Sequence, residues 1–174
     1  MENSNKQGNV GESFSGFTTV AIDAQVRALR VGDHSSALSN GASLIREARR
    51  LDQPVLLLRI KTPWDDNVVV PELVREVEQY ERCDEIEKNG MGGGEEILAA
   101  CSHHGFPTGK FVLFGFWLKG CVLSTARQLS LSLPDSEIVV VVDACNAEET
   151  EFESLFEDMP NVRLRTSQEI GSTI

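Results

Sequence analysis

The sequence predicts an α/β fold, a three-layer α/β/α arrangement with an open, mostly parallel sheet of six strands. Short apolar segments alternate along the chain with longer segments whose apolar residues recur at helical spacing. Consecutive parallel strands need crossover helices, so this alternation is typical of a doubly wound sheet or a barrel. Six strands are too few for an eight-stranded barrel. The unbroken apolar runs VLLLRI and EIVVVV suit central strands that are buried on both faces.

The elements follow one another in a regular order. Strands are expected at Thr18–Asp23, Pro54–Ile60, Cys83–Glu87, Lys110–Phe116, Glu137–Val142 and Val162–Thr166. Helices are expected between them at Ser35–Leu51, Pro71–Tyr80, Glu95–His104, Cys121–Leu133 and Glu148–Asp158. Pro71 suits the first turn of its helix, and Gly105 suits the end of the next. Pro134 and Pro160 each stop a helix, because proline cannot continue one.

The chain of 174 residues is close to the size of one domain. Residues 1–16 are polar and rich in Gly, Ser and Asn, so we expect a flexible N-terminal arm. Residues 17–174 are then a single domain, which at this length can bury roughly two-thirds of its unfolded surface.

Charge and cysteine usage limit the classes of function. The net charge of −11 argues against nucleic acid and anionic membranes as partners, because both repel an acidic surface. There is no apolar run of transmembrane length, and residues 1–16 contain no apolar segment like that of a secretory leader. The four cysteines are widely spaced and form no zinc-binding pattern. We expect a cytoplasmic protein with free thiols and no cofactor. Its partner would be a small molecule, and it would form a homo-oligomer of the common closed type.

Reactive side chains are expected at one edge of the sheet, because ligands of open α/β sheets bind at the carboxyl ends of the strands. Asp23 follows the first strand, Lys88 the third and Cys121 the fourth. A helix N-terminus and a nearby lysine would both lower the pKa of the Cys121 thiol. A carboxylate in reach could take the thiol proton. The alternative is that Cys121 is an ordinary, small buried residue.

Several segments together resemble one family. The segment Gly115–Ala147 contains a strand-ending glycine, a short loop, Cys-Val, a Thr-Ala helix, a valine-rich strand and Asp-Ala. It resembles the signature of the isochorismatase-like cysteine hydrolases. TTVAIDAQ (residues 18–25) resembles the first strand of that family, and DEIEKNG (residues 84–90) resembles the segment with its lysine. The resemblance covers roughly residues 17–170, in the same order.

The resemblance implies a strand order of 3-2-1-4-5-6, which places Asp23 and Cys121 on neighbouring strands. It implies that Cys121 attacks an electrophilic carbon, that Asp23 exchanges protons, and that Lys88 orients them. It also implies a cis peptide bond between Phe116 and Trp117, a bond that costs ~3–4 kcal/mol outside proline. The N–H groups of Trp117 and Cys121 would then face one oxyanion.

Four further residues are candidates for substrate binding. Gln25 belongs to the Ile-Asp-x-Gln motif, Trp64 lies in a long loop able to cover the site, and Trp117 and Leu118 precede the cysteine. The loop before the cysteine differs from the family pattern at Trp117, Leu118 and Lys119, and the tryptophan would fill the pocket or form one of its walls.

A metal is not expected. The nicotinamidase branch of the family carries an Asp-x-His-x-x-His-like metal site after the first strand, and this chain has only Asp33 and His34 there. The glycine-rich segment Asn89–Gly94 lacks the spacing of a dinucleotide-binding loop, so we interpret it as a flexible loop.

The sequence therefore predicts a hydrolase for a small amide, ester or related C–N or C–O bond, acting through a covalent thio-intermediate. Two alternatives stay open. One is a vinyl-ether hydrolase of the isochorismatase type, in which acid–base chemistry by Asp23 matters more than the thiol. The other is a degenerate member of the family that binds a ligand or a protein.

Overall fold

The computed structural model describes residues 16–30, 34–61, 68–145 and 152–171. They form one sheet in which all neighbouring strands are parallel, in the order β3-β2-β1-β4-β5-β6. The strands are β1 (Thr18–Ile22), β2 (Val55–Ile60), β3 (Cys83–Lys88), β4 (Lys110–Gly115), β5 (Glu137–Cys145) and β6 (Val162–Arg165). The predicted fold class and the strand order implied by the resemblance are both confirmed. Residues 1–15 of the expected arm lie outside the described residues.

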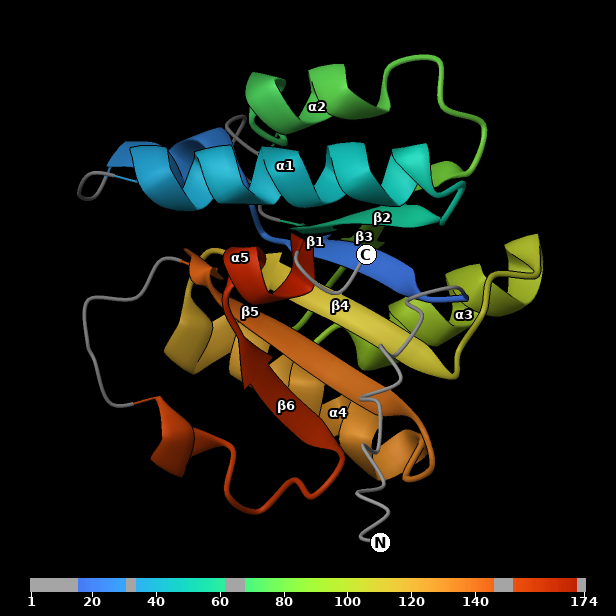
Figure 1. Cartoon of the computed structure of the whole chain (residues 1–174), viewed down its shortest axis with the longest axis vertical. Helices are drawn as coiled ribbons and strands as arrows, with labels where there is room; N and C mark the ends of the chain where they lie inside the picture. The colour runs from blue at the N-terminus through green and yellow to red at the C-terminus, as the bar shows by residue number, and fades with distance from the viewer. Residues whose placement is uncertain (1–15, 31–33, 62–67, 146–151, 172–174) are drawn as a thin grey trace, which may run out of the picture.

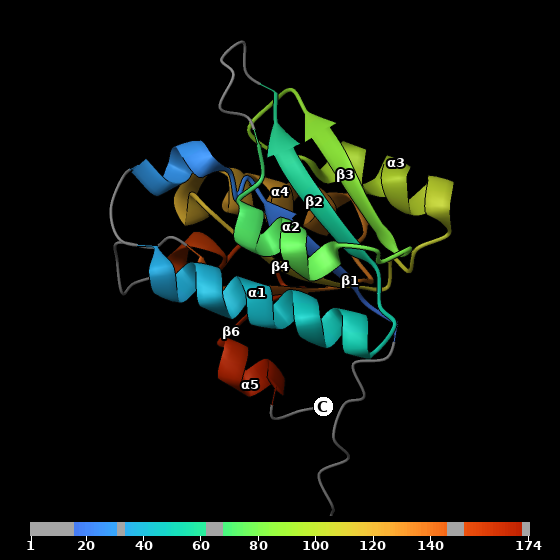
Figure 2. The same cartoon turned by 90° about the horizontal axis from the view of Figure 1, so that it is seen from above.

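Helices cover both faces of the sheet (Figure 1). They are α1 (Ser35–Arg50), α2 (Pro71–Val77), α3 (Gly94–His104), α4 (Leu123–Ser132) and α5 (Ser167–Gly171). The helices α1, α2 and α5 lie on one face, and α3 and α4 lie on the other. Figure 2 shows α1 and α2 lying side by side above the sheet. The direction of strand addition reverses between β1 and β4, which is where a doubly wound sheet opens a crevice.

The core lies on both sides of the central strands. All five residues of β1 are buried, and so are the first four of β2. Apolar side chains that point alternately up and down must be covered by helices on each face, which explains why these strands lack a polar face. None of the described helices is long and apolar enough to cross a membrane.

The prediction of a helix at Glu148–Asp158 is wrong for the residues of this range that the structure describes. Residues 146–151 lie outside the described part, and the remainder contains only a short 3₁₀ turn, η3 (Glu153–Leu155). The turn is followed by a hydrogen bond from the N–H of Met159 to the carbonyl of Phe156, 3.0 Å long. Both of those side chains are buried. Their three-residue spacing therefore arises from tight turns and not from an α-helix.

Candidate active site

Asp23 directly follows β1 and turns the chain at the reversal of strand order. Its φ angle is +50°, in the left-handed region that few residues other than glycine adopt. Its N–H donates to the carbonyl of Leu58 on the neighbouring strand β2, at 2.8 Å. The side chain is buried. A residue in this region costs about 1–3 kcal/mol, and such residues cluster at functional sites. The positive φ of Asp23 therefore marks this position as a candidate for function.

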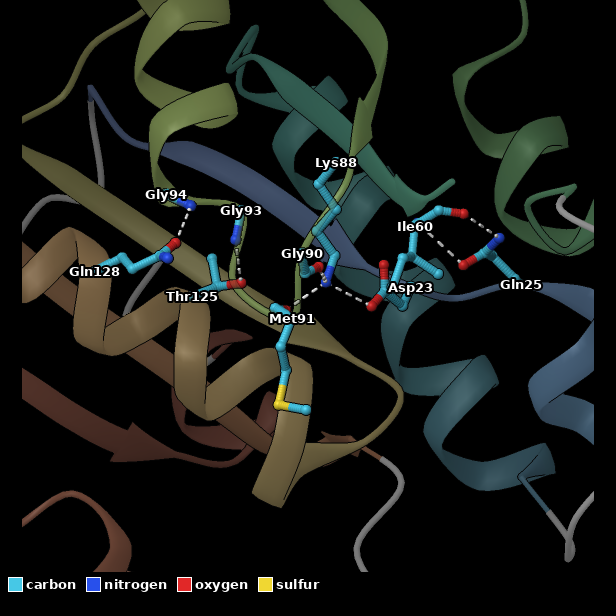
Figure 3. A network of polar contacts seen from close by, with 10 residues as sticks. All are labelled: Asp23, Gln25, Ile60, Lys88, Gly90, Met91, Gly93, Gly94, Thr125 and Gln128. Carbon is cyan, nitrogen blue, oxygen red and sulfur yellow. Dashed lines mark hydrogen bonds and ion pairs between the residues drawn. The ribbon is translucent and has the colours of Figure 1, made fainter. Parts of the chain in front are cut away.

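Lys88, at the end of β3, supplies the opposite charge. Its side chain is fully buried, and its Nζ lies 2.9 Å from Oδ2 of Asp23 (Figure 3). The ammonium also donates to the carbonyl oxygens of Gly90, at 3.1 Å, and Met91. One ion pair and two hydrogen bonds therefore surround the ammonium group. A buried charge needs such partners, because desolvation of an unpaired ion is very costly.

Cys121 is half-buried and interacts with both members of this ion pair. Burial, and after it the Asp23 carboxylate, raise the pKa of its thiol to about 11, against a smaller lowering by Lys88. The expected lowering of the thiol pKa is therefore wrong. The physical reason is first the loss of water around the sulfur, which disfavours the thiolate, and then the negative charge of Asp23 beside it. In the resting protein the thiol is protonated and faces a carboxylate.

The sequence predicted that Cys121 begins a helix, but in the structure it lies inside one. A π-helical turn, η2 (Leu118–Val122), precedes α4 and contains the cysteine. The carbonyl of Trp117 accepts hydrogen bonds from the N–H groups of Gly120, at 2.9 Å, and Val122, at 3.3 Å. Such π-turns are rare and concentrate at functional sites.

The cis peptide bond implied between Phe116 and Trp117 is absent, since every described peptide bond is trans. The chain reverses instead through Trp117 itself, whose φ and ψ are +65° and +63°. A left-handed residue makes the turn without the cost of a cis bond. Phe116 is buried against the ring of His34, with 5.3 Å between ring centroids, whereas 47% of Trp117 is exposed.

A glycine allows the two central strands to meet at the site. Gly115 ends β4 with a φ of +144°, and an added Cβ there would overlap the backbone carbonyl of Ile22 in β1. The N–H of Phe116 donates to that same carbonyl at 3.0 Å. Only glycine permits this approach, which brings the segment with Cys121 beside Asp23.

The candidates for substrate binding have different environments. Gln25 is buried, and its amide bonds to both backbone groups of Ile60: Oε1 accepts from the N–H at 3.2 Å, and Nε2 donates to the carbonyl at 3.4 Å. Its described contacts therefore hold the end of β2 (Figure 3). Leu118 is buried in the core. Trp64 lies outside the described residues.

Other polar groups near this edge have structural contacts. Asp143 accepts hydrogen bonds from the N–H of Ser167, at 2.7 Å, and from its hydroxyl, at 2.6 Å, which holds the start of α5. Within the part of the chain that the structure describes, no three His, Cys, Asp or Glu side chains gather as metal ligands would. His34 is described, and Asp33 is not.

Two residues of the site were missed from the sequence. Thr125 and Gln128 of α4 accept hydrogen bonds from the backbone of Gly93 and Gly94, in the loop that surrounds Lys88. Contacts between a side chain and a distant backbone leave no signal in residue spacing. The Thr-Ala pair in the resembling segment was the only hint, and it does not reveal the partner.

The sheet is parallel with the order 3-2-1-4-5-6, and a buried carboxylate–ammonium pair lies where that order reverses. These features define the class of protein as an isochorismatase-like α/β fold. The family model "Isochorismatase domain" matches residues 18–159, and the chain belongs to this family. A search of curated proteins found no match.

Solved structures share the fold at low sequence identity. N-carbamoylsarcosine amidase from Thermoplasma acidophilum is 18% identical, with a TM-score of 0.71 over 87% of this chain and 96% of its own. The YcaC gene product of Escherichia coli, an octameric hydrolase of unknown specificity, is 18% identical, with a TM-score of 0.73 over 91% and 79%. YcaC from Pseudomonas aeruginosa, solved with hexane-2,5-diol and covalent acrylamide, is 17% identical, with a TM-score of 0.73 over 91% and 80%.

Proposed function

We propose that this protein hydrolyses a small-molecule amide, or a related C–N or C–O bond, with Cys121 as nucleophile and Asp23 and Lys88 as its partners. The observation that carries the proposal is a buried Lys88–Asp23 ion pair whose two charges both act on the thiol of Cys121. Burying a lysine and an aspartate has a large desolvation cost, so an arrangement that also places a cysteine beside them favours a chemical role.

The resting protonation states define the first step. Because the thiol pKa is about 11, Cys121 has to lose its proton as it attacks. Asp23 accepts that proton while Sγ bonds to the substrate carbon, and the C–N bond breaks as the proton passes to the leaving nitrogen. Water then attacks the thioester, Asp23 takes a proton from the water, and the acid product leaves with Cys121 restored as a thiol.

Lys88 acts on Asp23 more than on the substrate. Its Nζ forms an ion pair with Asp23 at 2.9 Å and donates hydrogen bonds to the carbonyls of Gly90 and Met91, so its role is to hold the carboxylate in place.

The oxyanion would be held by backbone N–H groups at the start of η2. Among the described residues, none accepts a hydrogen bond from the N–H of Trp117. A helical start also concentrates free donors and partial positive charge close to Cys121. The exposed indole of Trp117 would form one wall of the substrate site, with Leu118 beneath it and with Trp64 and Gln25 as further contacts.

Two similar proteins bear on this proposal. One is named as an amidase of an N-carbamoyl compound, which suits C–N bond hydrolysis, and another was solved with covalent acrylamide, which shows that a protein of this fold can carry a covalent adduct. We also infer that the protein forms a homo-oligomer in the cytoplasm, as one octameric neighbour suggests for the assembly. No cofactor is required by this mechanism.

One alternative has an observation in its favour. The high thiol pKa leaves Cys121 unreactive at rest. That suits a vinyl-ether hydrolase in which Asp23 supplies the acid–base chemistry and the thiol only shapes the pocket.

A comparison of Cys121→Ala and Asp23→Asn in a screen of amides, carbamoyl compounds and vinyl ethers separates the two. Thioester chemistry predicts that both variants lose at least about a thousandfold in kcat/KM. It also predicts that mass spectrometry after rapid quenching finds an acyl group on Cys121. Cys121→Ala with nearly full activity would contradict a nucleophilic cysteine and favour the vinyl-ether reaction. Binding without turnover by the unmodified protein, across the screen, would favour the degenerate family member.

A further inference from the structure

The helix α3 begins with residues that cannot cap it. Its first N–H groups have no partner inside the helix, and such groups are normally satisfied by a Ser, Thr, Asp or Asn side chain at the cap. Here Gly93 is the capping residue and Gly94 is the first residue of the helix, so neither has a side chain to offer.

Two side chains of α4 satisfy these groups instead. Oγ1 of Thr125 accepts from the N–H of Gly93 at 3.1 Å, and Oε1 of Gln128 accepts from the N–H of Gly94 at 2.8 Å (Figure 3). Residues three apart share one face of a helix, so both acceptors approach α3 from the same side. We call this pair the Thr125–Gln128 clamp.

The glycines allow a close approach. A Cβ added at Gly92 would overlap the amide of Gln128, and one at Gly94 would lie 2.6 Å from its Cβ. A Cβ at Gly93 would lie 3.0 Å from Cδ of Lys88. The loop is therefore packed between α4 on one side and the stem of Lys88 on the other.

The same loop holds the ammonium group. The carbonyls of Gly90 and Met91 accept hydrogen bonds from the Lys88 ammonium. Cys121 lies four residues before Thr125 in the continuous helical segment formed by η2 and α4. The clamp thus connects the segment with the thiol to the loop around the lysine.

We propose that Thr125 and Gln128 are positioning residues for the hydrolytic site. They fix the glycine loop, and through its carbonyls the Lys88 ammonium, against the helix that presents Cys121. This inference depends on the proposed function. The clamp touches no reacting atom, and it acts by holding the loop that carries the acceptors of Lys88.

Gln128 allows a clean test because its side chain is exposed and its replacement leaves the core intact. Gln128→Met removes the acceptor at similar length, whereas Gln128→Glu keeps an oxygen. Arg127→Met is the matched control: the neighbouring exposed residue pairs with Asp158 at 3.1 Å and not with the loop. Thr125→Val and Thr125→Ser form a second pair, without and with the hydroxyl.

Two quantities are measured. The first is the pH at the titration midpoint of Cys121, which the 13Cβ chemical shift of cysteine-labelled protein reports. The second is the rate of hydrogen exchange at the N–H of Gly94. Burial is the largest cause of the high thiol pKa, and its charged neighbours are Asp23 and Lys88. Gln128→Met loosens the loop that holds the Lys88 ammonium, and that ammonium lowers the thiol pKa, so the midpoint should rise by at least about half a pH unit, roughly a threefold change in ionisation constant. Its Gly94 N–H should also exchange faster.

Gln128→Glu and Arg127→Met should both retain the wild-type midpoint. A merely structural role would change the melting temperature and leave the titration of Cys121 unmoved, and that result overturns the proposal. Equal shifts in Gln128→Met and Gln128→Glu overturn it as well. If Cys121→Ala still hydrolyses substrate, the proposed function fails, whatever Gln128 does. If Cys121 is essential and Gln128→Met titrates as the wild type, only the clamp fails.

Discussion

At the scale of single residues, Lys88 is the clearest departure from ordinary composition rules. Charged side chains are almost never fully buried unless they are paired, and this one has no exposed surface. Its pairing with Asp23 connects β3 to β1 across the end of β2.

Lys88→Met should destabilise the fold by about 3–5 kcal/mol, because it leaves the Asp23 carboxylate buried without its cation. Denaturant unfolding measures the loss. In the double variant Lys88→Met, Asp23→Leu most of the stability should return, since no lone charge remains. A double variant as unstable as the sum of the two single changes would contradict this view of the pair.

Trp117 also departs from ordinary rules, because a bulky residue occupies the left-handed region. Trp117→Gly should stabilise the fold by about 1 kcal/mol relative to Trp117→Ala, which loses the same indole but keeps the strained Cβ. Thermal unfolding checks the order. Both variants should raise KM for a substrate that contacts the indole. Equal melting temperatures for the two would remove the argument from strain.

At the scale of secondary-structure elements, the sequence was informative wherever one pattern governs a whole segment. The apolar runs of β2 and β5 predicted the sheet. The proline or glycine at helix ends, together with the helical spacing of apolar residues, predicted helices α1 to α4. The turns around the site were not predictable in this way. Trp117 adopts positive φ and η2 forms because the chain has to reverse beside Gly115, and this constraint arises only once β1 and β4 are paired.

The candidate site shows the same division. The positions of Asp23, Lys88 and Cys121 after strands were evident from the sequence, and the structure pairs Asp23 with Lys88 at 2.9 Å. The electrostatic environment of Cys121 was not evident, because it depends first on how deeply packing buries the thiol and then on the charges beside it. The contacts of Gln128 depend on how α3 and α4 pack.

The close approach of β1 and β4 should be sensitive to a single methyl group. Gly115→Ala should destabilise the protein by more than about 3 kcal/mol or prevent folding, because its Cβ meets the Ile22 carbonyl and its φ is positive. Gly109→Ala is the control at the other end of β4, where an added Cβ meets nothing within 4 Å. Soluble yield and chemical denaturation compare the two. A well-folded Gly115→Ala variant would show that the strands separate more easily than the structure indicates.

At the scale of the whole molecule, the buried thiols make stability depend on alkaline pH. Burial raises the pKa of Cys145 from 9.0 to about 12, and that of Cys121 from 9.0 to about 11. A group with a raised pKa in the folded state contributes fully below its unfolded value. That contribution is lost as the pH rises from about 9 toward the folded value.

The free energy of unfolding should therefore fall between pH 9 and pH 11, by up to about 1.4 kcal/mol per pH unit for each such thiol. Urea titrations at a series of pH values measure the slope. Cys145→Ala should be less stable at pH 7 but should show a shallower decline above pH 9. An identical slope in that variant would mean that Cys145 ionises normally in the folded protein.

The titration of Cys121 in the wild type and in Asp23→Asn tests most directly whether one buried cluster holds the carboxylate, the ammonium and the thiol. Asp23 raises the thiol pKa and Lys88 lowers it, so neutralising Asp23 leaves the cation unopposed. The 13Cβ shift of Cys121 should give a midpoint near 11 in the wild type and a midpoint at least one pH unit lower in Asp23→Asn. A variant that titrates with the wild-type midpoint would contradict the cluster.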